Sequence, residues 1–197
     1  MQNRWFRPPK PPLITGEITV NSFKMAAAFA AIILLFFSQA VRAEATLPLK
    51  EGQPAPDFSL PDQTGKTRTL AEFRGKWLAL YFYVKDDTPG CTEQACKYRD
   101  DIHELSDLGA QVVGISVDDS SSHADFAKKY SLPFPLLADT GGATAARYGS
   151  LRENGTLAKR NTFLIDPNGR IAKIYLSAST SRNSAEVIAD LKRLKGS

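Results

Sequence analysis

The feature that most constrains the fold is a nearly continuous apolar run at residues 77–84, Trp-Leu-Ala-Leu-Tyr-Phe-Tyr-Val, which leads directly into a turn. A run of this kind, without alternating polar residues, is typical of a strand buried on both faces of a sheet. Both faces of such a sheet must be covered, because each one has to be removed from water. The run therefore predicts the central strand of a layered α/β domain.

The elements around this run agree with that class of fold. Turn residues at 62–66 and 166–169 each separate two short extended segments, so each predicts a β-hairpin. Helices are expected at 92–108, from 121, and at 143–148 and 185–194, and further strands at 111–116, 134–137, 162–165 and 171–175. This order predicts a thioredoxin-like fold, in which a central mixed β-sheet is flanked by helices on both faces and preceded by an N-terminal β-hairpin.

The start of the chain resembles a secretory signal peptide. Basic residues precede an apolar run at 25–37, and small residues lead up to the predicted cleavage site after Ala43 or, as second choice, Ala45. A run of about 13 residues is shorter than the roughly 20 that span a hydrocarbon core, but an uncleaved N-terminal membrane anchor is the alternative. We therefore divide the chain into a leader at 1–43 and one domain at 44–197.

The leader also carries the excess positive charge of the chain. The whole sequence has 25 Lys and Arg against 21 Asp and Glu, and residues 1–43 hold five basic and one acidic residue, which leaves 20 of each. A neutral domain gives no reason to expect a nucleic-acid partner. We expect a periplasmic or otherwise exported protein that is not inserted in a membrane after cleavage. A start at Met25 would leave no positive charge before the apolar run.

The two cysteines of the chain, Cys91 and Cys96, lie five positions apart. Cys91 follows a Thr-Pro-Gly turn at the predicted start of a helix, where unpaired N–H groups and the helix dipole favour a thiolate. A structural disulfide is the alternative in an exported protein. However, positions five apart on one helix have Cα atoms roughly 8.7 Å apart, whereas a disulfide tolerates at most about 7 Å. We expect a reactive nucleophile and a neighbouring thiol that it can join only when the helix unwinds.

Two further residues are candidates for the same site. Thr88 lies three positions before Cys91, so its hydroxyl can turn back towards the sulfur or cap the helix. Arg160 precedes the strand predicted at 162–165, and strand ends converge where open α/β sheets place their sites. Its guanidinium could hold a thiolate ionised, although basic residues at strand ends are commonly just solvated.

Other polar residues are not expected to take part in chemistry. His103 and His123 have no partners at ligand spacing, so we expect no metal. The Asp86-Asp87 pair is expected to form a turn. A glycine-rich phosphate-binding loop is missing from the sequence, and we expect no cofactor.

The segment at 83–96, Tyr-Val-Lys-Asp-Asp-Thr-Pro-Gly-Cys-Thr-Glu-Gln-Ala-Cys, is similar to the active-site segment of peroxiredoxins of the bacterioferritin-comigratory-protein (PrxQ) type. The resemblance spans residues 50–195 and includes the segments at 114–118, 129–137 and 160–166. Val84 departs from the pattern, because the family has a proline there that lines the pocket.

This resemblance implies an atypical 2-Cys thiol peroxidase. Cys91 would attack a peroxide oxygen and become a sulfenic acid, while Thr88 would hydrogen-bond the peroxide and Arg160 would polarise it. Cys96 would then form an intramolecular disulfide with Cys91, and a thioredoxin-like dithiol reductant would return both to thiols. The resemblance further implies hydrogen peroxide and organic hydroperoxides as substrates, and a monomer.

Two other classes of function are open alternatives. Thiol–disulfide oxidoreductases of the thioredoxin fold separate their cysteines by two residues, and the four-residue gap between Cys91 and Cys96 argues against that activity. The second alternative is a non-catalytic thioredoxin-like binding domain in which a disulfide between the two cysteines is structural.

Overall fold

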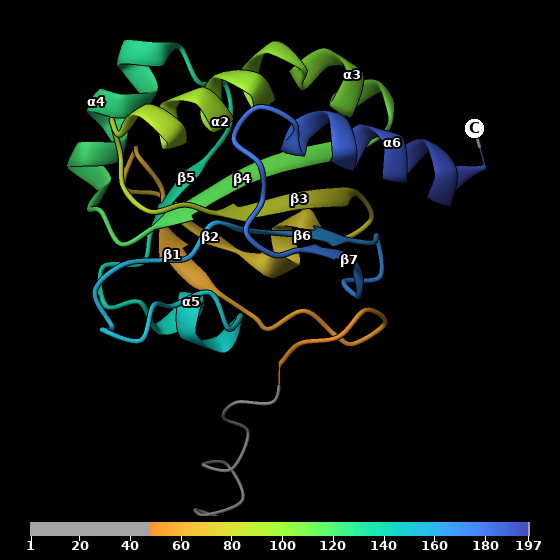
Figure 1. Ribbon diagram of the computed structural model, residues 1–197, viewed down its shortest axis with the longest axis horizontal. Helices are drawn as coiled ribbons and strands as arrows, with labels where there is room; N and C mark the ends of the chain where they lie inside the picture. Colours follow the sequence, from red (N-terminus) through yellow and green to blue (C-terminus); the bar gives the residue numbers. More distant parts are fainter. Residues whose placement is uncertain (1–47, 197) are drawn as a thin grey trace, which may run out of the picture. The chain divides into compact units, whose positions relative to one another are not determined.

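The computed structural model describes residues 48–196 of the chain (Figure 1). The predicted leader, its cleavage sites and the domain boundary after residue 43 lie outside the described residues and stay predictions. Within residues 48–196, the search for a helix with the length and apolar character of a membrane span finds none.

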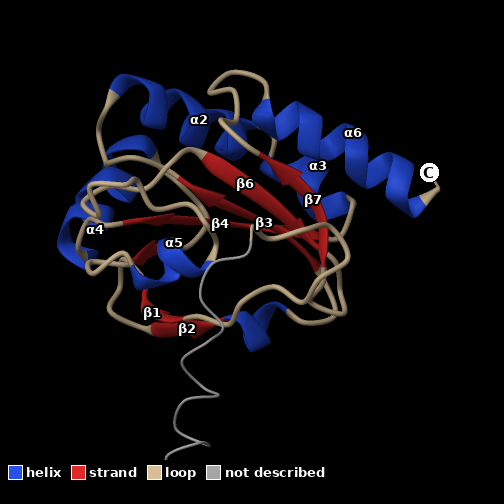
Figure 2. Ribbon diagram, turned by 60° about the horizontal axis from the view of Figure 1, so that its bottom comes forward, coloured by secondary structure: helices blue, strands red, loops and turns tan. Residues whose placement is uncertain are grey.

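A mixed sheet forms the centre of the domain (Figure 2). It has five strands in the order β5-β4-β3-β6-β7. The strands are β3 (Trp77–Phe82), β4 (Ala110–Ser116), β5 (Leu136–Ala138), β6 (Asn161–Ile165) and β7 (Ile171–Tyr175). β4 is parallel to both β3 and β5, whereas β6 is antiparallel to both β3 and β7. The apolar run that predicted a central buried strand is confirmed as β3.

Helices cover both faces of this sheet, as expected. The other elements are β1 (Ser59–Pro61), β2 (Thr67–Thr69), the 3-10 helix η1 (Leu70–Phe73), α2 (Pro89–Asp100), α3 (Ile102–Asp107), α4 (Ser120–Tyr130), α5 (Ala143–Arg147) and α6 (Asn183–Lys195). Buried residues of α2, α3, α4 and α6 pack on one face, and those of α5 and η1 pack on the other (Figure 1). The predicted N-terminal hairpin is confirmed as the antiparallel pair of β1 and β2.

The single helix predicted over 92–108 is wrong in two respects. It begins earlier, at Pro89, because proline at the first helical position has a suitable φ and lacks only an N–H that would be unpaired there. It is also interrupted at Asp101, where ψ is 5° and the side chain is held by a hydrogen bond of 2.6 Å from the hydroxyl of Ser184. The chain therefore forms two helices, α2 and α3.

Aromatic packing fixes α2 on the sheet. Tyr81 of β3 and Tyr98 of α2 are fully buried and stack with their ring centroids 5.0 Å apart. Gly114 on the neighbouring strand makes room for this stack, because a Cβ there would lie 2.8 Å from the ring of Tyr81. The helix that carries both cysteines is thus held against the centre of the sheet.

Candidate active site

Cys91 lies in the first turn of α2, directly beyond the loop that leaves the end of β3 (Figure 1). Thr88 is the N-cap residue, and Cys91 is the third residue of the helix. The Cys91 side chain is 1% exposed. Its position brings the thiol close to the unpaired N–H groups and the positive end of the helix dipole. The predicted placement at a helix N-terminus is confirmed.

Arg160 reaches this sulfur from the position just before β6, the strand that pairs with β3. β6 is antiparallel to β3, and Asn161 at its start pairs with Phe82 at the end of β3, so Arg160 lies beside the exit of β3. Its Nη2 donates to the Sγ of Cys91 at 3.2 Å. A Cβ at Gly90 would lie 3.2 Å from Cγ2 of Thr180 and 3.4 Å from Nη2 of Arg160, so the closer contact would be with Thr180. The expected convergence of the strand ends at Cys91 is therefore observed.

The hydroxyl of Thr88 lies in the same turn. It donates to the backbone carbonyl of Lys85 at 3.0 Å, and it makes no capping hydrogen bond to the N–H groups of α2. A hydroxyl has a single proton, so donation to this carbonyl and donation to the sulfur of Cys91 are alternatives. Rotation about the C–O bond of Thr88 can exchange the two.

The surroundings of Cys91 favour its ionised form. Burial is the largest single influence and raises the pKa of the thiol, but hydrogen bonds from the Thr88 side chain, the Lys85 backbone and Arg160, together with the charge of Arg160, outweigh it. The pKa of Cys91 therefore lies below the ordinary value for a thiol. A buried thiolate of this kind is a nucleophile that is shielded from bulk solvent.

Cys96 lies further along the same helix and is half-buried. Both cysteines are free thiols, and α2 is continuous between them. Arg99 of the same helix lies near Cys96, and a hydrogen bond to the carboxylate of Asp100 raises the pKa of the Arg99 guanidinium, whereas burial lowers it. As long as α2 is intact, positions 91 and 96 are too far apart for their sulfurs to form a disulfide.

A buried amide network lies next to Arg160 and was not predicted from the sequence. Gln94 is fully buried, and its Oε1 accepts a hydrogen bond of 2.7 Å from Nη1 of Arg160. The Oδ1 of Asn183 accepts from Gln94, Tyr98 and Thr162 at 3.1, 2.7 and 2.7 Å. Gln94, itself held by Asn183, thereby fixes the orientation of the Arg160 guanidinium. One sequence signal was available, because Gln94 is three positions after Cys91 and lies on the same helix face.

The two aspartates before the cysteine loop form a turn, as expected. Asp87 has a φ of 56°, and its carboxylate accepts from Lys129 and Tyr130 of α4. The side chain of Asp86 is buried, which was not expected, and it lies 2.8 Å from the imidazole of His123, also of α4. The two neighbouring side chains are therefore anchored at opposite ends of one helix.

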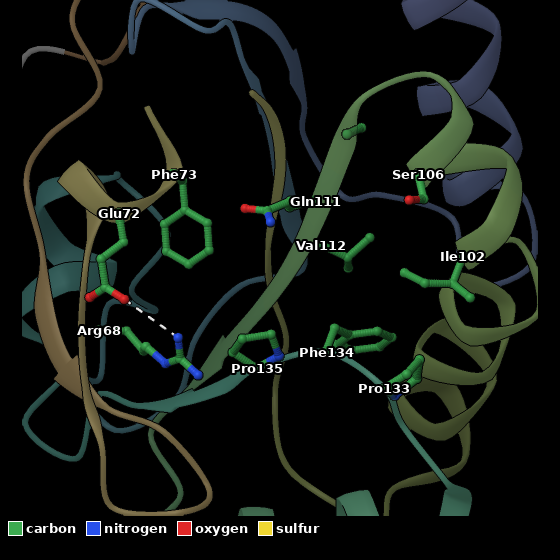
Figure 3. A pocket seen from close by; sticks show the side chains of 11 residues that line it. Arg68, Glu72, Phe73, Ile102, Ser106, Gln111, Val112, Pro133, Phe134 and Pro135 are labelled. Carbon is green, nitrogen blue, oxygen red and sulfur yellow. Dashed lines mark hydrogen bonds and ion pairs between the residues drawn. The ribbon is translucent and has the colours of Figure 1, made fainter. Parts of the chain in front are cut away.

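A surface pocket of about 280 Å³ lies apart from the cysteines, between η1, α3 and β4. Figure 3 shows Pro133, Phe134 and Pro135 on one side of it and the ion pair of Arg68 and Glu72 on another. None of the four predicted site residues lines it. Across residues 48–196 no group of three or more His, Cys, Asp or Glu side chains could hold a metal ion.

Comparison with known proteins gives consistent matches. The family model described as AhpC/TSA family matches residues 51–174. A chloroplastic peroxiredoxin Q from Populus jackii is 48% identical over 128 residues, which cover 64% of this chain and 60% of the relative. A putative peroxiredoxin bcp from Coxiella burnetii is 40% identical over 151 residues, covering 74% of this chain and 100% of the relative. The chain thus spans about three fifths of the plant relative's length.

Solved structures give the same picture. The crystal structure of peroxidoxin BcpB from Mycobacterium tuberculosis matches with a TM-score of 0.70 and 36% identity, covering 74% of this chain and 98% of that one. A PrxQ mutant from Xylella fastidiosa matches with a TM-score of 0.71 and 25% identity, covering 76% and 99%.

Proposed function

This chain belongs to the AhpC/TSA family, among its peroxiredoxin Q and bcp members, and from that membership we propose that it is a thiol-dependent peroxidase with Cys91 as its nucleophile. The observation that carries the proposal is the contact between the guanidinium of Arg160 and the sulfur of a buried cysteine at a helix N-terminus. Hydrogen peroxide and organic hydroperoxides are the proposed substrates.

In the first step the Cys91 thiolate attacks the nearer oxygen of the peroxide. An S–O bond forms as the O–O bond breaks, and the cysteine becomes a sulfenic acid. The leaving oxygen takes the bonding electron pair and a proton and departs as water or an alcohol. Arg160 stabilises the negative charge that develops on the oxygens, and the hydroxyl of Thr88 donates to the bound peroxide.

In the second step Cys96 resolves the sulfenic acid. Its thiolate attacks the sulfur of Cys91, the hydroxyl group leaves as water after protonation, and an intramolecular disulfide forms. Because the two positions are too far apart on an intact α2, the helix has to unwind locally before this bond can form. A thioredoxin-like dithiol reductant then exchanges with the disulfide and restores both thiols.

The proposed setting follows from the sequence and the relatives together. The leader supports export to the periplasm or another compartment, and the matched plant relatives are named as chloroplastic. We propose that the mature protein acts outside the cytoplasm as a monomer, and that it draws electrons from a dithiol protein in the same compartment.

Serine variants of the two cysteines test this proposal. Stopped-flow peroxide consumption by the purified domain should vanish in Cys91→Ser. Cys96→Ser should retain one fast turnover and accumulate a sulfenic acid on Cys91, visible by mass spectrometry after trapping. Full peroxide consumption by Cys91→Ser would refute the proposal, and a wild-type domain that reduces protein disulfides but not peroxides would indicate an oxidoreductase instead.

A further inference from the structure

A buried polar cluster joins the loop before α2 to the first turn of α4. Its centre is Asp86, which is 7% exposed, and its deepest member is His123, which is fully buried. The hydroxyl of Tyr83 donates to Oδ1 of Asp86 at 2.7 Å, and the hydroxyl of Ser122 donates to Oδ2 at 2.7 Å. Nδ1 of His123 lies 2.8 Å from the same Oδ2.

The protons in this cluster can be assigned from the contacts. A carboxylate oxygen accepts, so Nδ1 of His123 carries the proton that faces Asp86. Nε2 of His123 is buried and has no hydrogen-bond partner within residues 48–196. Burial raises the pKa of Asp86, but hydrogen bonds from His123, Tyr83 and Ser122 have the larger combined effect and lower this pKa below its ordinary value. Asp86 is therefore an ionised acceptor of three donors.

The backbone at Lys85 and Asp86 faces the thiol and is held by hydrogen bonds. The N–H of Asp86 donates to Oδ2 of Asp118 at 2.9 Å, and the carbonyl of Lys85 accepts from the hydroxyl of Thr88 at 3.0 Å. Hydrogen bonding from the Lys85 backbone is one of the influences that lower the pKa of Cys91. The hydroxyl of Tyr83 is hydrogen-bonded to the carboxylate of Asp86, and this contact closes a short loop that contains Lys85.

We propose that Asp86 is a positioning residue, which keeps the Lys85 peptide groups directed at Cys91 and Thr88 by anchoring the loop to Ser122 and His123 of α4. The inference rests on the proposed thiol chemistry of Cys91 and adds to it. Asp86 touches none of the reacting atoms in this scheme; it acts through the backbone of its neighbour.

The direction of the effect separates this role from a simple charge effect. Replacing an ionised aspartate near Cys91 by a neutral residue removes a negative charge, which by itself would favour the thiolate and lower the pKa of Cys91. Loss of the hydrogen bonding from the Lys85 backbone would instead raise that pKa. The two explanations therefore predict shifts of opposite sign.

The test compares Asp86→Asn with Asp87→Asn, both in a Cys96→Ser background that leaves one thiol. Asp87 is a matched control, because it is the adjacent residue, undergoes the same chemical change and, unlike Asp86, makes its contacts with α4, to Lys129 and Tyr130, at an exposed position. Its φ of 56° is also a conformation that asparagine tolerates. The readout is the pH dependence of alkylation of Cys91 by iodoacetamide, which follows the thiolate fraction.

We expect the midpoint of this profile to move to higher pH in Asp86→Asn and to stay at its reference position in Asp87→Asn. A rise of one unit would slow alkylation below the midpoint by about tenfold. An unchanged or lowered midpoint in folded Asp86→Asn would overturn the proposal. Should that variant fail to fold, as a thermal unfolding scan would show, Ser122→Ala decides in the same assay, because it removes one donor to Asp86 and should raise the midpoint to a smaller extent.

The outcome is independent of the peroxidase test. If the wild-type domain did not consume peroxide but Asp86→Asn still raised the alkylation midpoint, the proposed function would fail and the positioning role would stand. If peroxide were consumed and the midpoint did not rise, the positioning role alone would fail.

Discussion

Nη2 of Arg160 lies 3.2 Å from the Sγ of Cys91, although 69 positions separate the two residues. The antiparallel pairing of β6 with β3 brings them together, because it places the start of one strand beside the end of the other. The same guanidinium is held from behind by Gln94 at 2.7 Å. Arg160 can therefore interact with the thiolate and with an incoming oxygen without first having to reorient.

Replacement of Arg160 should reduce peroxide consumption strongly. Arg160→Met removes both the charge and the donor at the sulfur, and loss of one such donor commonly lowers the rate by about 10²- to 10³-fold. Arg160→Lys should recover only part of the loss, because lysine cannot contact Cys91 and Gln94 with one planar group. The measurement is the second-order rate constant with hydrogen peroxide. Arg152→Lys, at an exposed position, serves as the control, and a wild-type rate in Arg160→Met would contradict the assigned role.

The rate of peroxide reduction should depend on the hydroxyl of Thr88 more than on the shape of its side chain. Thr88→Val keeps the branched side chain but loses the donor, and we expect the rate of peroxide reduction to fall on the order of 10²-fold. Thr88→Ser keeps the hydroxyl and should retain most of the wild-type rate. Equal rates in the valine and serine variants would show that the hydroxyl takes no part in the reaction.

Oxidation should open part of α2. The disulfide between Cys91 and Cys96 cannot form across an intact helix, so we expect its closure to break the contact of Gln94, which lies between them, with Asn183. Hydrogen exchange should show amides of α2 losing protection in the oxidised protein, while those of β3 keep it. The Cys96→Ser variant, which cannot form the disulfide, provides the control. Equal protection of α2 in both redox forms of the wild type would contradict this expectation.

Asp62 should contribute a pH-dependent part of the stability. Burial raises the pKa of its carboxyl, but hydrogen bonds from Thr64, Arg68 and the Lys66 backbone have the larger combined effect and hold this pKa below its ordinary value. A pKa that is lower in the folded state gives stability that is present above the unfolded pKa and is lost as pH falls through the folded one. The difference in free energy of unfolding between wild type and Asp62→Asn should therefore be constant near neutral pH and shrink in acid. Urea titrations across this range would measure it, and a difference that did not change with pH would be inconsistent with the shift.

Local patterns were enough to predict most of the fold. The apolar run of β3 and the turn residues of both hairpins depend on neighbours in sequence, and the structure agrees with each. The interruption at Asp101 was not predictable in this way, because the hydrogen bond that accompanies it comes from Ser184 in the last helix.

The site was predictable to the same extent. Cys91, Thr88 and Cys96 share one segment, and the topology of the predicted fold was sufficient to add Arg160. Gln94 and Asp86 were missed, because a buried polar side chain is recognised by its partners and those lie far away in sequence, at Asn183 and His123. The sequence pattern at Asp86 is that of a turn, and only the packing of α4 shows that the carboxylate is buried.

The central claim is that Cys91 is held as a thiolate by the groups around it, and titration of this sulfur tests it most directly. In the Cys96→Ser variant, the ultraviolet absorbance of the thiolate should be followed against pH, with Cys91→Ser/Cys96→Ser as the blank. We predict a midpoint clearly below about 8.5, the ordinary pKa of a cysteine thiol. A midpoint at or above that value would contradict the account.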